Sequence, residues 1–101
     1  MMIASRLEQP VARAKADLAG RLDIEIDAIE TLEARFVTWP NGAIGCPKPD
    51  MMYTQALVPG YRILLRTESG THAYHGAREA DPFYCPPELV TEPLPDSDVS
   101  R

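Results

Sequence analysis

One stretch of this 101-residue chain restricts the fold more than any other, the segment from Val37 to Arg62. It contains the single Trp, one of the two Cys, four of the ten Pro and three of the six Gly. Proline removes a backbone donor and glycine supplies unusual dihedral angles, so this composition disfavours a long helix or a regular strand. Long loops in small domains are usually functional or disordered, and the large apolar residues here argue against disorder. We therefore predict an ordered loop over residues 39–55.

An amphipathic helix is predicted from Gln9 to Leu22. Its apolar residues fall at helical spacing, while the charged residues lie on the other sides of the helix. Pro10 is tolerated only in the first turn, which places the start of the helix near Gln9. We expect the apolar stripe to cover a sheet; it consists of Val11, Ala14, Leu18 and Leu22, with Leu7 just ahead.

A half-buried strand is predicted from Glu30 to Trp39. Val37 and Trp39 are apolar in the opposite phase to the first half of the strand. The strand is therefore either buried on both faces or changes register at a bulge near Phe36. The apolar residues of the first half, which share one face, are Leu32, Ala34 and Phe36.

Two further strands, residues 61–67 and 71–75, follow the loop and form a hairpin with Ser69-Gly70 at the centre of a two-residue turn. In that register Leu65 lies opposite Tyr74 on the core face. The other face is expected to be solvated or to contact a partner; it carries Arg62, Leu64, Arg66, Ala73 and His75.

These elements predict an α+β fold, with one N-terminal helix packed on a small antiparallel meander of about three strands. Residues 1–85 form a single domain of ordinary size. Residues 86–101 contain four prolines and four acidic residues, so we expect a disordered acidic C-terminal tail.

The net charge of −5 excludes some classes of partner. No basic stripe is present for phosphate-backbone binding, so nucleic acid is not an expected partner. No apolar run approaches the roughly 20 residues of a membrane span, so no membrane partner is expected either. With no signal-like segment, the cytoplasm is the default location, and an exported mature form is the alternative. We expect a monomer or a weak dimer.

The two cysteines, Cys46 and Cys85, allow one disulfide. In a reducing cytosol two free thiols are the expected state. In an oxidising compartment a bridge that closes about 39 residues would stabilise the fold by roughly 3–4 kcal/mol.

A zinc site built from Cys46, His72, His75 and Cys85 is not expected. The two histidines stand three apart on a predicted strand, so their side chains leave opposite faces, and neither Cys has a close Cys neighbour. We predict no metal and no cofactor. A Cys46 nucleophile with His75 as its base is conceivable, but Pro47 removes the N–H that would follow the nucleophile. No catalytic residues are predicted.

The central segment resembles a family of small, uncharacterised bacterial proteins over roughly residues 12–85. The resemblance implies no activity and transfers no catalytic residues. Asp23 and Asp50 stand where that family usually has Gly. The residues that carry the resemblance are Asp17-Leu18-Ala19-Gly20-Arg21-Leu22, Trp39-Pro40-Asn41-Gly42, Gly45-Cys46-Pro47, Pro49, Met51-Met52-Tyr53-Thr54-Gln55, Pro59-Gly60-Tyr61-Arg62, and Tyr74-His75 with Cys85.

In architecture, a helix followed by a meander is similar to cystatin-like and propeptide-type domains, several of which bind or inhibit proteases through projecting loops. Fold analogy alone is a weak guide to function.

Met51-Met52-Tyr53 is interpreted either as a short helical turn capped by Asp50 and packed in the core, or as an adaptable contact surface. The function we predict is a non-enzymatic protein-binding module that uses loop 39–55, in its narrower form a protease inhibitor. The alternative is a thiol-based enzyme or redox protein that uses Cys46 with Cys85 or His75. The predicted binding residues are Trp39, Ile44, Met51, Met52, Tyr53 and Arg62.

Overall fold

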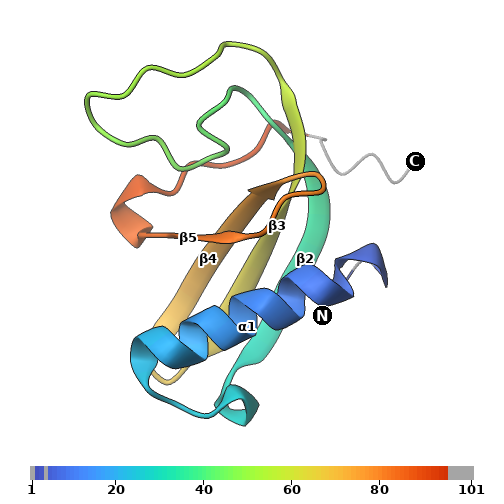
Figure 1. The fold of residues 1–101 in the computed structure, drawn as a ribbon, viewed down its shortest axis with the longest axis vertical. Helices are drawn as coiled ribbons and strands as arrows, with labels where there is room; N and C mark the ends of the chain where they lie inside the picture. Colours follow the sequence, from blue (N-terminus) through green and yellow to red (C-terminus); the bar gives the residue numbers. More distant parts are fainter. Residues whose placement is uncertain (1, 4, 96–101) are drawn as a thin grey trace.

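The computed structural model of this chain describes residues 2–3 and 5–95 and has the α+β fold. A five-stranded sheet has the order β1-β2-β3-β4-β5, and one helix lies across it (Figure 1). Strand β1 pairs in parallel with β2, and the other neighbours are antiparallel. The elements are β1 (Met2–Ile3), η1 (Ser5–Leu7), α1 (Glu8–Leu22), η2 (Ile26–Ala28), β2 (Glu30–Trp39), β3 (Val58–Thr67), β4 (Gly70–Ala77), β5 (Phe83–Cys85) and η3 (Pro87–Leu89).

The helix and the meander agree with the prediction, but the sheet has five strands and not about three. The additional strands, β1 and β5, are two and three residues long. Segments this short do not show the two-residue alternation by which a strand is recognised in a sequence. Among the residues that the structure places, no helix is long and apolar enough to cross a membrane.

Helix α1 begins at Glu8, one residue before the predicted start, and keeps Pro10 in its first turn. It ends at Leu22 and is capped by Asp23, whose φ of 57° is left-handed and whose N–H donates to the carbonyl of Ala19. Glycine is the usual residue in this capping conformation, and Asp23 adopts it here.

The core lies between α1 and one face of the sheet. The register sets Ala34 beside Ile63, and Ile63 beside Tyr74, across three neighbouring strands. The Tyr74 hydroxyl donates to Asp17 of the helix at 2.6 Å. The buried members of this core are Leu7, Val11, Ala14, Leu18, Ile29, Ala34, Tyr61, Ile63, Leu65 and Tyr74.

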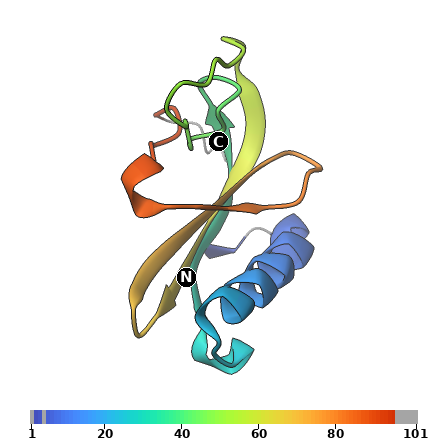
Figure 2. The same cartoon turned by 60° about the vertical axis from the view of Figure 1, so that its left-hand side comes forward.

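The opposite face of the sheet is also buried. Val37 and Trp39 point away from the helix, because they alternate with Ala34 and Phe36 along β2. Figure 2 shows α1 on one side of the sheet and the connection between β2 and β3 on the other. Of the two alternatives for β2, burial on both faces is therefore the one observed. The bulge predicted near Phe36 lies instead between Thr31 and Glu33.

The hairpin of β3 and β4 has the predicted faces but a different register. Thr67 pairs with Gly70, so the turn centre is Glu68-Ser69 and Tyr74 lies opposite Ile63. The Oγ1 atom of Thr67 accepts a hydrogen bond from the Ser69 N–H at 3.1 Å, which holds this turn. The displacement is two residues, which preserves the side of the sheet that each side chain occupies.

Residues 86–95 pack against the body of the protein. The Thr91 N–H donates to the carbonyl of Gly45 at 2.9 Å, and the Leu94 N–H donates to that of Thr38 at 3.0 Å. The expectation of a disordered tail is therefore wrong for residues 86–95, and residues 96–101 lie outside the described part of the chain. The composition of residues 86–95 indicates that this segment cannot fold alone. Composition does not show that another part of the fold provides a surface on which the segment packs.

Candidate functional site

The central loop is the connection between β2 and β3, residues 40–57. Its two ends are joined by a hydrogen bond from the Gly42 N–H to the Thr54 carbonyl at 2.8 Å. Within it, Asn41 Oδ1 accepts from the Ala43 N–H at 2.9 Å, and the Tyr53 hydroxyl accepts from the Lys48 N–H at 3.0 Å. These bonds agree with the prediction of an ordered loop.

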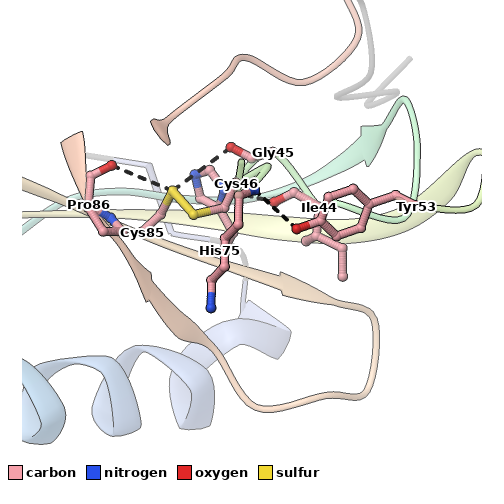
Figure 3. Close-up of a disulfide and its surroundings, with 8 residues drawn as sticks. Ile44, Gly45, Cys46, Tyr53, His75, Cys85 and Pro86 are labelled. Carbon is pink, nitrogen blue, oxygen red and sulfur yellow. Dashed lines mark hydrogen bonds between the residues drawn. A yellow bond between two sulfur atoms is a disulfide. The ribbon is translucent and has the colours of Figure 1, made fainter. Parts of the chain in front are cut away.

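A disulfide between Cys46 and Cys85 links the central loop to β5. The two Cα atoms are 5.9 Å apart, and the residues are 39 positions apart in the sequence. Both cysteines are buried, with 4% and 1% of their surfaces exposed. Figure 3 shows the bridge between the Gly45-Cys46 turn and the Cys85-Pro86 segment. The sequence left open whether the thiols are free or bridged, and the structure has the bridge.

Trp39 lies beneath the central loop and is fully buried. Its ring stacks on His75 with 4.4 Å between centroids, and Nε1 donates to the Gly76 carbonyl at 3.3 Å. Gly45 packs on the same Trp39 ring so closely that a Cβ atom there would overlap it. Trp39 was predicted as a binding residue, but its position makes it a support for the loop and not part of the outer surface.

His75 of β4 contacts the backbone of the central loop. Its Nδ1 lies 2.9 Å from the Ile44 carbonyl oxygen (Figure 3). Since a carbonyl oxygen only accepts, Nδ1 must carry the hydrogen. Burial lowers the pKa of His75, although the hydrogen bond to Ile44 opposes this effect. The imidazole is therefore neutral at pH 7, and its Nε2 atom is buried without a hydrogen-bond partner among the described residues.

Arg62 is also covered, with 8% of its surface exposed. It pairs with Glu33 at 2.9 Å and with Glu92 of the C-terminal segment at 2.8 Å. Burial raises the pKa of Glu33, but hydrogen bonds from Arg62 and Arg35 outweigh this and hold the pKa below its usual value. The interpretation of this sheet face as a solvated or partner-facing surface is therefore wrong at Arg62 and His75, because the central loop and residues 86–95 cover them.

The exposed part of the central loop follows the turn at residues 48–51. The Met51 N–H donates to the Lys48 carbonyl, and Asp50 takes a left-handed φ of 66°. Residues 51–55 then continue without regular secondary structure, so the helical turn considered for Met51-Met52-Tyr53 does not form. The exposed fractions are 57% for Met51 and 96% for Met52, and both side chains are available to a partner.

A groove of about 760 Å³ lies between the central loop, β5 and helix α1. Its charged rim contains two ion pairs, Arg13 with Asp81 and Arg21 with Asp17, and the separate cation Lys48. The apolar lining includes three predicted binding residues, Ile44, Met51 and Tyr53. It also includes three residues that were not predicted, Pro82, Phe83 and Tyr84.

Sequence reasoning missed Phe83 and Leu57 as exposed apolar residues, at 38% and 62%. Phe83 lies in Asp81-Pro82-Phe83-Tyr84-Cys85, which follows the predicted hairpin. Phe83 pairs with His75 at the start of β5. Because β5 is the edge strand of the sheet, no further strand among the described residues covers Phe83. No local pattern distinguishes that position from a core aromatic.

The histidines and cysteines do not meet as a cluster. His72 Nε2 bonds to the Thr67 and Ser69 hydroxyls at the far end of the hairpin, while His75 lies under the central loop. Over residues 2–3 and 5–95, no three His, Cys, Asp or Glu side chains are placed to hold a metal ion.

Comparison with known proteins shows one match. The model of a domain of unknown function, DUF8738, matches residues 11–85, which agrees with the expected resemblance to an uncharacterised family over roughly residues 12–85. The match assigns no role to individual motif residues. No curated protein and no solved structure matches significantly. Since the matched region covers most of the chain and includes the helix, the central loop and the disulfide, the chain belongs to the DUF8738 family.

Proposed function

We propose that this protein is a non-enzymatic binding module that captures a protein partner with the central loop and the adjoining groove. The observation that carries the proposal is the exposure of Met51, Met52 and Leu57 on a loop that the rest of the molecule holds in place. Exposed large apolar side chains mark contact surfaces when they gather on one segment. A loop that is already ordered loses little conformational freedom on binding.

The groove indicates the chemistry of the partner. An apolar centre around Met51, Tyr53 and Phe83 with a charged rim is the usual arrangement of a protein interface. Arg13 and Arg21 on this rim already have carboxylate partners, whereas Lys48 has none among the described residues. The partner we propose therefore inserts an apolar side chain into the groove and carries an acidic residue beside it.

A random peptide library displayed on phage tests this proposal. Selection should enrich peptides with an aromatic or large aliphatic residue next to Asp or Glu. The triple variant Met51→Ser, Met52→Ser, Leu57→Ser should weaken binding of a selected peptide by about a hundredfold or more, because clustered apolar anchors dominate interface energies. Ile26→Ser is the matched control, since Ile26 is a 48% exposed apolar residue in η2, outside the loop and groove. Equal binding by the triple variant and the parent protein would refute the proposal.

Protease inhibition is the narrower form of this proposal. Residues 51–55 form no helix or strand and are mostly exposed, and the bond between Tyr53 and Lys48 fixes the start of this segment. Such a segment suits the substrate cleft of a protease. Incubation with chymotrypsin and with papain, followed by residual-activity assays, should show inhibition that the triple variant loses. If neither protease is inhibited and the loop is cleaved, the narrower form is wrong.

The thiol-based alternative has less support. Both sulfurs are paired and buried, and the Nδ1 atom of His75 donates to a carbonyl and is not placed as a base beside a thiol. An activated thiolate needs an accessible, electropositive environment. Alkylation by iodoacetamide after mild reduction measures this directly, and rapid reaction well below pH 8 would favour the thiol-based alternative.

An oxidising compartment is part of the proposed function. The cytoplasm is the default location predicted from the sequence, but disulfides persist mainly in exported proteins. The Cys46–Cys85 bridge therefore supports the exported alternative. Mass measurement after alkylation of protein taken directly from its native host should show two unmodified cysteines. Two alkylated cysteines would indicate free thiols and therefore a reducing compartment.

A further inference from the structure

A second cavity, of about 680 Å³, lies where the N-terminal end of α1 meets the connection from β4 to β5. Figures 1 and 2 both show this connection beside the start of the helix. The volume is within the range of small-molecule sites. The cavity is separate from the exposed part of the central loop, and the ion pair between Arg13 and Asp81 lines both it and the groove.

Three arginines from different segments surround this cavity: Arg6 of η1, Arg13 of α1 and Arg78 after β4. Arg13 pairs with Asp81 at 3.0 Å. Neither Arg6 nor Arg78 is paired with a carboxylate within the described part of the chain. A concentration of guanidinium groups is notable in a chain with a net charge of −5.

The floor of the cavity is apolar. Leu7 and Tyr61 are 2% and 1% exposed, and Phe36 packs against the same core. The guanidinium of Arg78 lies over the Phe36 ring, 5.1 Å from its centroid. The Tyr61 hydroxyl donates to the Ala80 carbonyl, and burial raises the pKa of Tyr61 to about 12, so this hydroxyl stays a donor.

The wall formed by the β4–β5 connection is held in one conformation. The Arg78 N–H donates to the Pro59 carbonyl and the Ala80 N–H to that of Ala77, both at 3.0 Å. Glu79 between them has a left-handed φ of 70°, which is unfavourable for a residue with a side chain. These contacts set the backbone from which Arg78 reaches the cavity.

We infer that this cavity binds a small amphipathic monocarboxylate. The carboxylate lies between the guanidinium groups of Arg6 and Arg78, and the apolar body lies on Leu7, Phe36 and Tyr61. Guanidinium groups match the planar geometry of a carboxylate and bind it through charge-assisted hydrogen bonds. The cavity lining carries three positive and two negative residues, counting Glu79 and Asp81, so its net charge of +1 suits one negative charge better than two.

The test is a titration of ¹⁵N-labelled protein followed by amide chemical shifts. The probes are 4-phenylbutanoate, the neutral 4-phenylbutan-1-ol and the dianionic 4-phenylbutyl phosphate. The carboxylate should produce saturable shifts at the amides of Leu7 and Ala80, and the alcohol should bind at least about tenfold more weakly, because charge-assisted hydrogen bonds are lost. The double variant Arg6→Gln, Arg78→Gln should lose at least about tenfold in carboxylate affinity.

A second double variant, Lys15→Gln with Arg66→Gln, removes the same charge outside the cavity and should bind the carboxylate as the parent does. Absence of saturable shifts at Leu7 and Ala80 would overturn the inference. So would equal binding of the alcohol, tighter binding of the phosphate, or unchanged affinity in the arginine double variant. Because this readout involves neither the central loop nor a protein partner, its failure is distinguishable from failure of the proposed function.

Discussion

At the residue scale, two glycines differ in whether their surroundings leave room for a side chain. Gly45 has a φ of 73°, and an added Cβ would overlap the Trp39 ring and lie 2.8 Å from His75 Nδ1. Gly20, inside α1, has nothing within 4 Å of an added Cβ. Gly45 is thus a glycine that the packing of the central loop requires.

We predict that Gly45→Ala lowers the free energy of unfolding by about 3 kcal/mol or more, from overpacking and backbone strain together. Gly20→Ala should raise it by about 0.5–1 kcal/mol, because Ala is the better helix former. Urea denaturation of both variants and the parent measures this. A Gly45→Ala protein as stable as the parent would contradict the position assigned to the loop.

His75 gives the fold a pH dependence. Burial lowers its pKa below the usual 6.5, so the unfolded chain takes up the proton first as the pH falls. Stability is therefore full above about pH 6.5 and decreases as the pH falls from there toward the folded-state pKa. Asp17 and Glu33 have lowered pKa values too, from 3.8 and 4.5, so their effect begins at lower pH.

The variant His75→Asn keeps a donor for the Ile44 carbonyl but does not titrate. We predict that its stability changes less than that of the parent between pH 7 and roughly pH 5. Urea midpoints across this range provide the measurement, and His72→Asn is the control. A parent protein with a flat profile over the same range would disprove the role given to His75.

At the element scale, local patterns predicted the helix and the first long strand, since α1 begins within one residue of expectation and β2 has the predicted bounds. Both rest on periodicity and on the position of Pro10, which are local properties. The hairpin register was missed because Thr67 and Gly70 pair across the turn, a choice that depends on side-chain hydrogen bonds. The ordering and position of the central loop could also be predicted.

The roles of Trp39 and Arg62 could not be predicted, because they depend on which segments cover the second face of the sheet. That coverage comes from long-range contacts of the central loop and residues 86–95. For Met51 and Met52 the sequence left open whether they pack in the core or form a contact surface. Their exposure is a property of the folded loop.

The disulfide joins the central loop to β5. We predict that the double variant Cys46→Ser, Cys85→Ser loses about 4 kcal/mol of unfolding free energy, the chain-entropy value for a separation of 39 residues. Unfolding of the parent with and without a phosphine reductant should show the same difference. A loss below about 1 kcal/mol would mean that the bridge adds little to a loop already fixed by other contacts.

At the scale of the whole molecule, the sheet separates a helical layer from a layer of loop segments. On one side α1 closes an apolar core; on the other the central loop and residues 86–95 cover Trp39, His75 and Arg62. The two proposed sites lie at opposite ends of the β4–β5 segment, the groove beside Phe83 and the carboxylate cavity beside Arg78. Both depend on loops that the body of the protein holds in one conformation.

Native-state hydrogen exchange by NMR tests this account most directly, because the central claim is that the central loop is a fixed part of the fold. The amides of Gly42 and Thr91 donate across the loop, to Thr54 and Gly45. They should exchange at least about a hundredfold more slowly than the exposed Met52 amide, and lose much of that protection when Cys46–Cys85 is reduced. Exchange of Gly42 and Thr91 as fast as that of Met52 in the oxidised protein would contradict the account.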